Sequence, residues 1–81
     1  MKSFFNYFNS AFYGCKSLVN IDGLSNWNVS NGNDFQYMFD GCTSLTDTSP
    51  LVSWLKNGTG MKSDANTTGM FSNVPGGNPF N

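Results

Sequence analysis

The chain has 81 residues, and its four basic residues against five acidic ones give a net charge of −1 at pH 7. This balance argues against a nucleic-acid partner, because a phosphate backbone is bound by clustered basic residues. The absence of histidine leaves a Ser or Cys nucleophile without its ordinary base. We therefore expect no enzyme, no cofactor and no metal ion. No segment approaches about 18 consecutive apolar residues, so no membrane-spanning helix is expected.

One eleven-residue segment occurs twice, at 8–18 and again at 35–45, with matched positions 27 residues apart. The same spacing continues beyond the segment as far as Trp54. A fixed period of roughly 20–50 residues indicates a solenoid, in which each repeat stacks on the one before it. The matched pairs are Phe8 with Phe35, Phe12 with Phe39, Gly14 with Gly41, Cys15 with Cys42, Ser17 with Ser44, Leu18 with Leu45, Leu24 with Leu51 and Trp27 with Trp54.

The first repeat, at about 3–29, is expected to hold a short helix followed by a short strand. Its apolar residues at positions 8, 11, 12 and 15 are spaced as on one face of a helix. Gly14 stands where such a helix would end on a left-handed residue. Apolar residues then recur every three positions, which suits a solenoid turn with a strand near 19–22.

The second repeat, at about 30–56, shows the same helical spacing over 35–42, with Gly41 as the expected stop. Its strand is expected to be weak, because Thr48 replaces an apolar residue of the first repeat and Pro50 follows closely. The aromatic and methionine side chains of the two helices are expected to form the core. These core residues are Phe8, Phe12, Phe35, Met38 and Phe39.

The last third of the chain departs from this period. Residues 57–66 are nearly devoid of apolar side chains and are expected to be an insertion. A Met-Phe pair at 70–71 then repeats the pair at 38–39, at a spacing of 32, and the prolines and glycines that follow end any regular structure. Residues 67–81 are therefore expected to form a partial third repeat with an irregular tail, in one small domain or fragment over 1–81.

The Gly-Cys-x-Ser-Leu step and the tryptophan that follows it occur twice in register. In these features the chain resembles the BspA-like leucine-rich repeat surface proteins, most closely over 34–45 and 11–27. The resemblance implies a right-handed leucine-rich solenoid on a cell surface, where members bind host proteins, other microbes or matrix. The expected fold class is therefore an α/β repeat: a short right-handed leucine-rich-repeat-like solenoid of about two and a half coils, with short helices and short parallel strands.

Two pairs of matched side chains are candidate site residues. Trp27 and Trp54 either form a ligand-contact stripe that stacks on sugar rings or close the core of each coil, and we favour the core. Stacked coils bring Cys15 and Cys42 to about one strand spacing, roughly 4.8 Å, which a disulfide tolerates. A ladder of buried thiols explains the repetition without a bond, so we favour reduced cysteines.

These features predict a non-catalytic, surface-displayed leucine-rich-repeat module for adhesion, which binds a protein or glycan on a cell surface or matrix. The alternative is a structural subunit or segment of a phage virion, tail fibre or other extracellular assembly. The aromatic start at Phe4 and Phe5 is expected to be an apolar end that self-associates or packs on a neighbouring chain. The first residues do not form a convincing signal peptide, so we expect either a fragment of an exported protein or another route to the cell surface or virion.

Overall fold

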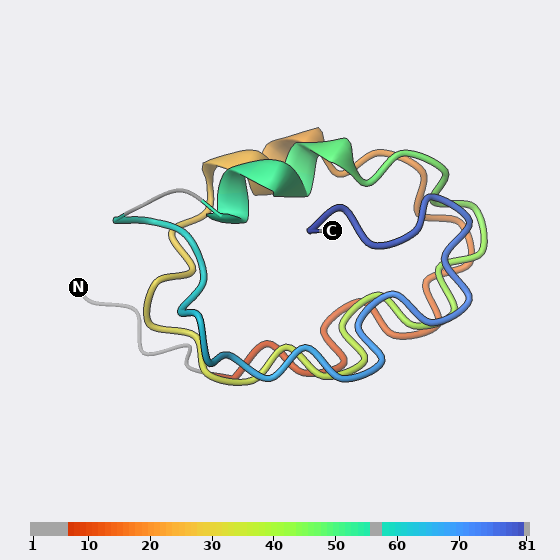
Figure 1. Cartoon of the computed structure of the whole chain (residues 1–81). Coiled ribbons are helices and arrows are strands. Elements are labelled where there is room, and N and C mark those ends of the chain that lie inside the picture. The colour runs from red at the N-terminus through yellow and green to blue at the C-terminus, as the bar shows by residue number, and fades with distance from the viewer. Residues whose placement is uncertain (1–6, 56–57, 81) are drawn as a thin grey trace.

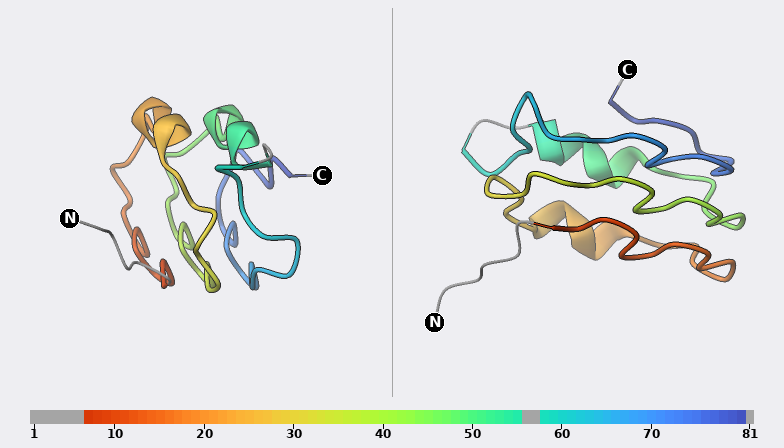
Figure 2. Two further views of the ribbon diagram at one scale, coloured as in Figure 1. Left: turned by 90° about the vertical axis from the view of Figure 1, so that its left-hand side faces the viewer. Right: turned by 90° about the horizontal axis from the view of Figure 1, so that it is seen from below.

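The computed structural model describes residues 7–55 and 58–80. The chain follows a similar path three times, the last time incompletely, and the three passes lie side by side (Figures 1 and 2). Two isolated parallel bridges set their register, one joining Tyr7 to Asp34 and the other joining Asp34 to Asn66. We call the three passes coil 1 (residues 7–33), coil 2 (residues 34–65) and coil 3 (residues 66–80).

Two short 3-10 helices, η1 (Asp22–Asn26) and η2 (Ser49–Leu55), are the regular elements of the described residues. They contact each other at matched places in coils 1 and 2, along one side of the molecule (Figure 1). Neither an α-helix nor a strand occurs within 7–55 or 58–80. The expected α/β class, a leucine-rich-repeat-like solenoid of short helices and parallel strands, is therefore wrong.

Successive turns stand where the two helices were expected, over 8–15 and 35–42. Irregular chain that leads into η1 stands where the first strand was expected, near 19–22. The second strand is replaced by η2, and Pro50 is accommodated there because the first turn of a helix does not need the proline N–H.

An alternation of hydrogen bonds explains why the expected helices do not form. We call residues 7–18, 34–45 and 66–77 the turn segments of the three coils. Over 10–15 in coil 1 and 37–42 in coil 2, every second N–H donates to the carbonyl three residues earlier, and the N–H groups between them donate to the next coil. An α-helix needs every N–H for its own bonds to the fourth residue before. In coil 2 the internal bonds run from the N–H groups of Met38, Asp40 and Cys42 to the carbonyls of Phe35, Tyr37 and Phe39. The bonds to coil 3 run from the N–H groups of Tyr37, Phe39 and Gly41 to the carbonyls of Thr68, Met70 and Ser72. All six N···O distances are 2.9–3.2 Å.

Two columns of residues in the left-handed conformation stand at matched positions of the three turn segments, and Gly77 adds a third such residue in coil 3. The first column consists of Ser10, Tyr37 and Gly69, with φ of 58°, 57° and 63°, and the second of Gly14, Gly41 and Asn73, with φ of 72°, 81° and 60°. A left-handed residue cannot continue a right-handed helix. The expectation that Gly14 and Gly41 are left-handed is confirmed, although no helix precedes them.

The core is centred on coil 2, because this coil has a neighbour on each side. Phe35 and Phe39 are fully buried. Their coil-1 counterparts Phe8 and Phe12 are only partly buried and stack on them, with ring centroids 5.1 and 5.3 Å apart. Phe71 of coil 3 extends the second stack at 5.6 Å. The buried apolar residues are Ile21, Val29, Phe35, Met38, Phe39, Cys42, Leu45, Leu51, Trp54, Met70 and Val74, which confirms the three core residues expected in coil 2.

Candidate interaction surfaces

The outer side of the turn segments carries three exposed tyrosines. Tyr7, Tyr13 and Tyr37 are 70%, 62% and 41% exposed, and they alternate along the chain with inward residues such as Phe8 and Phe12. We call this surface the turn face. Its polar residues are Asn9, Ser10, Asp34, Gln36, Asp40, Asn66, Thr68, Ser72 and Asn73.

Hydrogen bonds and close packing hold the turn face in place. Asp34 opens the coil-2 segment as an Asx-turn, because its Oδ1 accepts the N–H of Gln36 at 3.0 Å. Asn66 makes the same turn at the start of the coil-3 segment, also at 3.0 Å. The Tyr37 ring lies so close to Gly69 that a Cβ at this glycine would come within 2.5 Å of two ring carbons. The polar groups and Tyr37 are therefore presented by a backbone of repeated, defined geometry.

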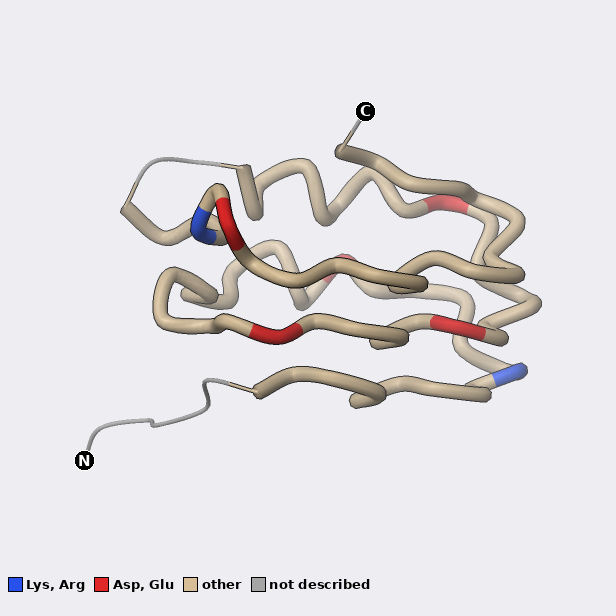
Figure 3. Tube along the Cα trace, turned by 60° about the horizontal axis from the view of Figure 1, so that its bottom comes forward, with Lys and Arg blue, Asp and Glu red and all other residues tan. Residues whose placement is uncertain are grey.

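Charge contributes little to the turn face. Figure 3 shows isolated charged residues along the turn segments, and the acidic ones are Asp34 and Asp40 of coil 2. Asp40 accepts a hydrogen bond from Nδ2 of Asn73 at 3.3 Å. A surface of Tyr, Asn and Ser with few charges is typical of protein-binding loops, in which tyrosines supply rigid contact area and small polar side chains adapt their hydrogen bonds.

The two tryptophans stack in register, with ring centroids 6.2 Å apart and an angle of 17° between the rings. Trp54 is 1% exposed, and its Nε1 donates to the carbonyl oxygen of Leu24 at 2.8 Å. Trp27 is 39% exposed and lies 6.2 and 6.4 Å from the rings of Phe8 and Phe12. A ligand can therefore reach one ring of the pair, that of Trp27, at the coil-1 end of the molecule.

Both cysteines are free thiols. Cys15 is exposed, whereas Cys42 is buried and donates its Sγ hydrogen to the carbonyl oxygen of Phe12 at 3.1 Å. Burial raises the pKa of the Cys42 thiol; Cys15 and Asp40 nearby act in the same direction, against a hydrogen bond from the Cys15 backbone. The raised pKa keeps Cys42 as a neutral thiol at pH 7, the form that is inert as a nucleophile.

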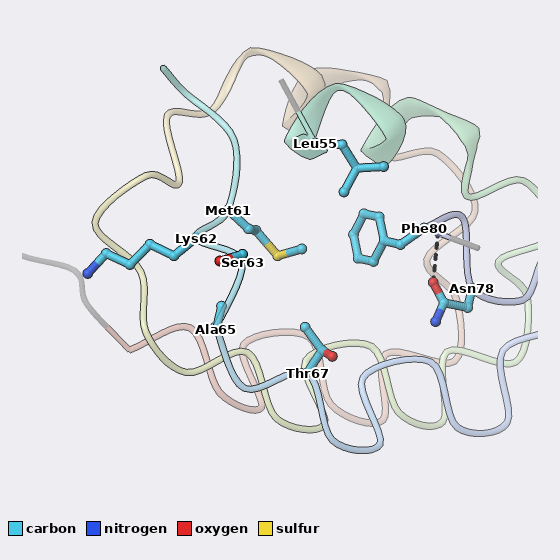
Figure 4. Close-up of a pocket in the computed structure, with 8 residues that line it drawn as sticks. All are labelled: Leu55, Met61, Lys62, Ser63, Ala65, Thr67, Asn78 and Phe80. Atoms are coloured by element: carbon cyan, nitrogen blue, oxygen red, sulfur yellow. Dashed lines mark hydrogen bonds between the residues drawn. The ribbon is translucent and has the colours of Figure 1, made fainter. Parts of the chain in front are cut away.

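A cavity of about 530 Å³ lies at the coil-3 end, between η2 and the turn segment (Figure 4). Phe80 and Met61 face each other across it, and Phe80 packs edge-on against Phe71 with ring centroids 5.6 Å apart. Lys62 extends away from the cavity, and its Nζ donates to Oδ1 of Asn33 at 2.8 Å. The lining residues are Leu55, Met61, Lys62, Ser63, Ala65, Thr67, Asn78 and Phe80.

Sequence reasoning missed both the turn face and this cavity. The three tyrosines stand at different positions of the repeat, so no matched column marks them. The available signal was their place between inward residues: an aromatic side chain that falls outside the apolar spacing of its own segment must point to solvent. Phe80 carried a weaker signal, as the last aromatic residue of an irregular tail.

A family model described as Mycoplasma protein of unknown function, DUF285, matches residues 2–78. The chain belongs to this family. DUF285 is associated with BspA-like repeat surface proteins. Comparison with curated proteins and with solved structures gave no match.

In the described part of this DUF285 chain, no three His, Cys, Asp or Glu side chains are grouped so that they could hold a metal ion. None of the helices over 7–55 and 58–80 has the length and apolar character needed to cross a membrane. The apolar end expected at Phe4 and Phe5 lies outside the described residues. Three surfaces that the described residues leave open to a partner are the turn face, the coil-1 end with Trp27, and the coil-3 end with its cavity.

Proposed function

We propose that this DUF285 chain is a non-catalytic module, displayed at a cell surface, that binds a protein partner through its turn face. The observation that carries the proposal is the group of three exposed tyrosines, Tyr7, Tyr13 and Tyr37, among small polar residues on the neighbouring turn segments of coils 1 and 2. Tyrosine buries a large area with few rotatable bonds, so it contributes contact at a low entropic cost.

The size of the chain is compatible with such an interface. A standard protein–protein interface takes about 800 Å² from each partner, and the chain exposes 4928 Å² in total. The partner would therefore cover about a sixth of the surface, and the stack is 32 Å long in its largest dimension.

The family association with repeat surface proteins supports the cell-surface part of the proposal. The Gly-Cys-x-Ser-Leu step at Gly14 and Gly41 supports a closer relation to the BspA-like members. A protein partner is favoured over a glycan because the stacked tryptophans leave a single accessible ring, Trp27, whereas the turn face offers three tyrosines.

An array of purified extracellular proteins and glycans, probed with the labelled chain, tests this proposal. We expect binding to protein spots and its loss in the variant Tyr7→Ser/Tyr13→Ser/Tyr37→Ser. The loss should be at least about tenfold in affinity, since that corresponds to about 1.4 kcal/mol, less than a single strong interface residue contributes. Serine is suited to the left-handed site of Tyr37, because Ser10 occupies the matched position with φ of 58°.

The matched control is Val19→Ser/Val52→Ser, which changes side chains that are 64% and 49% exposed but lie outside the turn segments. This variant should bind as the unmodified chain does, and unfolding curves should show that all three proteins are folded. The proposal is contradicted if no protein is bound, if glycans alone are bound, or if the tyrosine variant binds as well as the control.

A second candidate function is that of a structural subunit in an extracellular assembly or virion. It is favoured by a different observation, namely the two open ends of the stack. At both ends, backbone groups that bond the next coil elsewhere in the molecule lack a partner within the described residues. The weight-average mass of the chain in a sedimentation experiment tests this candidate: a subunit would gain mass with concentration.

A further inference from the structure

Eight backbone hydrogen bonds between the turn segments point one way, from each coil to the next. Only the two ends of the coil-3 segment donate backwards, from Asn66 to Asn33 and from Gly76 to Leu45, both at 2.9 Å. Four N–H groups of coil 1 donate to carbonyls of coil 2, and four N–H groups of coil 2 donate to carbonyls of coil 3. The first set runs from Phe8 to Asp34, Ser10 to Gln36, Phe12 to Met38 and Gly14 to Asp40, at 2.7, 2.9, 2.8 and 2.7 Å. The second runs from Phe35 to Asn66, Tyr37 to Thr68, Phe39 to Met70 and Gly41 to Ser72, at 2.7, 3.0, 2.9 and 3.0 Å.

This direction leaves opposite groups open at the two ends of the stack. The coil-1 edge presents carbonyl oxygens, and the coil-3 edge presents N–H groups, without partners within the described residues. The two rows have the same spacing along the chain, because each consists of every second residue of a turn segment. The carbonyls belong to Tyr7, Asn9, Ala11 and Tyr13, and the N–H groups to Thr67, Gly69, Phe71 and Asn73.

We propose that the chain associates head to tail, with the coil-3 edge of one copy against the coil-1 edge of a second copy. Continuing the register of the stack, the N–H groups of Thr67, Gly69, Phe71 and Asn73 would donate to the carbonyls of Tyr7, Asn9, Ala11 and Tyr13 of the second copy. The second copy then takes the place of a fourth coil, and each row of backbone groups finds the partners it has elsewhere in the molecule.

Other arrangements of two copies do not satisfy these groups. Two coil-1 edges face to face would set carbonyl against carbonyl, and two coil-3 edges would set N–H against N–H. A buried backbone group without a partner is destabilising, so the pairing of unlike ends is favoured. A contact between unlike surfaces repeats without closing unless its rotation makes a ring, so a series of oligomers is expected rather than a closed dimer.

Apolar side chains behind both edges support the same contact. At the coil-1 end, Phe8 and Phe12 are only partly buried, and Trp27 is 39% exposed. At the coil-3 end, Met61 and Phe71 are also partly buried. The tail at 78–80 runs nearer η2 than the turn segment (Figures 1 and 2). Association would remove apolar surface from water at both ends, which is favourable.

This inference deepens the second candidate function and does not depend on protein binding by the turn face. Its test is directional cross-linking between two variants that each carry one exposed cysteine, Asn9→Cys and Thr68→Cys, both in a Cys15→Ala background that keeps the buried Cys42. Positions 9, 36 and 68 are matched in the three coils, so a head-to-tail contact places position 68 of one copy beside position 9 of the next. Within one chain these positions are two coil spacings apart, about 10 Å, too far for a disulfide.

The two variants are mixed and mildly oxidised. We expect the yield of the mixed disulfide dimer to be severalfold higher than the yield from a control pair, Val19→Cys with Thr68→Cys. The unmodified chain should also gain weight-average mass with concentration. Three results would each overturn the proposal. They are an excess of the Asn9→Cys homodimer, a mixed dimer no more abundant than in the control, and a chain that stays monomeric to high micromolar concentration. Such a failure leaves the array experiment unaffected, because that experiment reads the turn face.

Discussion

At the scale of single residues, the shape of each coil depends on its two left-handed positions. A glycine adopts this conformation without the steric clash of a Cβ, and Gly14 and Gly41 fill the second column in coils 1 and 2. The first column contains Ser10 and Tyr37 instead, whose side chains disfavour it. Packing between coils therefore compensates for local strain at these positions.

Gly41→Ala tests this dependence. We expect a loss of about 1–2 kcal/mol in the free energy of unfolding, because φ is +81° there and a Cβ is disfavoured in the left-handed region. The added Cβ would also lie 3.4 Å from the Cα of Gly14. Gly23→Ala is the matched control: its φ is not positive and no atom lies within 4 Å of the added Cβ, so the change should stay within about 0.5 kcal/mol. Equal effects in urea unfolding would show that the turn geometry is not as described.

Residue identity predicted only part of this pattern. Glycine followed by cysteine at a repeated position indicated a left-handed residue at Gly14 and Gly41. Nothing in a tyrosine or a serine signals that conformation, so Ser10 and Tyr37 could not be predicted. The turn face was missed because its three tyrosines stand at different positions of the repeat, and the left-handed conformation of Tyr37 depends on the packing between coils.

At the scale of elements, the apolar spacing of the turn segments correctly predicted which side chains point inward. It wrongly predicted that the backbone would be helical. Phe35, Met38, Phe39 and Cys42 are all buried, as a helix with that spacing would also bury them. A chain of turns with left-handed residues returns to the same side at similar intervals, so the spacing alone does not separate the two. The deciding factor is the neighbouring coil. Its carbonyl oxygens accept hydrogen bonds from alternate N–H groups of the turn segment, and those N–H groups are then not available for a helix.

The two tryptophans give a prediction at this scale. Trp54 of η2 is buried and donates through Nε1 to the carbonyl of Leu24 at 2.8 Å, so Trp54→Phe removes both a buried hydrogen bond and part of a stacked ring. We expect it to cost at least about 1 kcal/mol more than the matched change Trp27→Phe, since Trp54 is buried and loses a hydrogen bond, whereas Trp27 is 39% exposed. Thermal or urea unfolding of both variants measures the difference in the free energy of unfolding. A larger loss of stability for Trp27→Phe would contradict the assignment of Trp54 as the buried ring.

At the scale of the whole molecule, the stack is organised around its middle coil and has a direction. Coil 2 is bonded on both sides, whereas coils 1 and 3 are bonded on one side and keep partly buried aromatic rings. The sequence spacings of 27 and 32 are those at which the parallel bridges pair the chain, Tyr7 with Asp34 and Asp34 with Asn66. The direction of the bonds was not predictable, because it depends on backbone orientation rather than on any side chain.

Amide hydrogen exchange, followed by NMR on this 8.9 kDa chain at a concentration where it is monomeric, tests that organisation most directly. The inter-coil amides of Phe35, Tyr37, Phe39 and Gly41 should exchange slowly, since each donates to coil 3. The matched amides of Thr67, Gly69, Phe71 and Asn73 should exchange fast, because the next coil is absent. Equal protection of the two sets, or fast exchange of both, would contradict the directional stacking of coils.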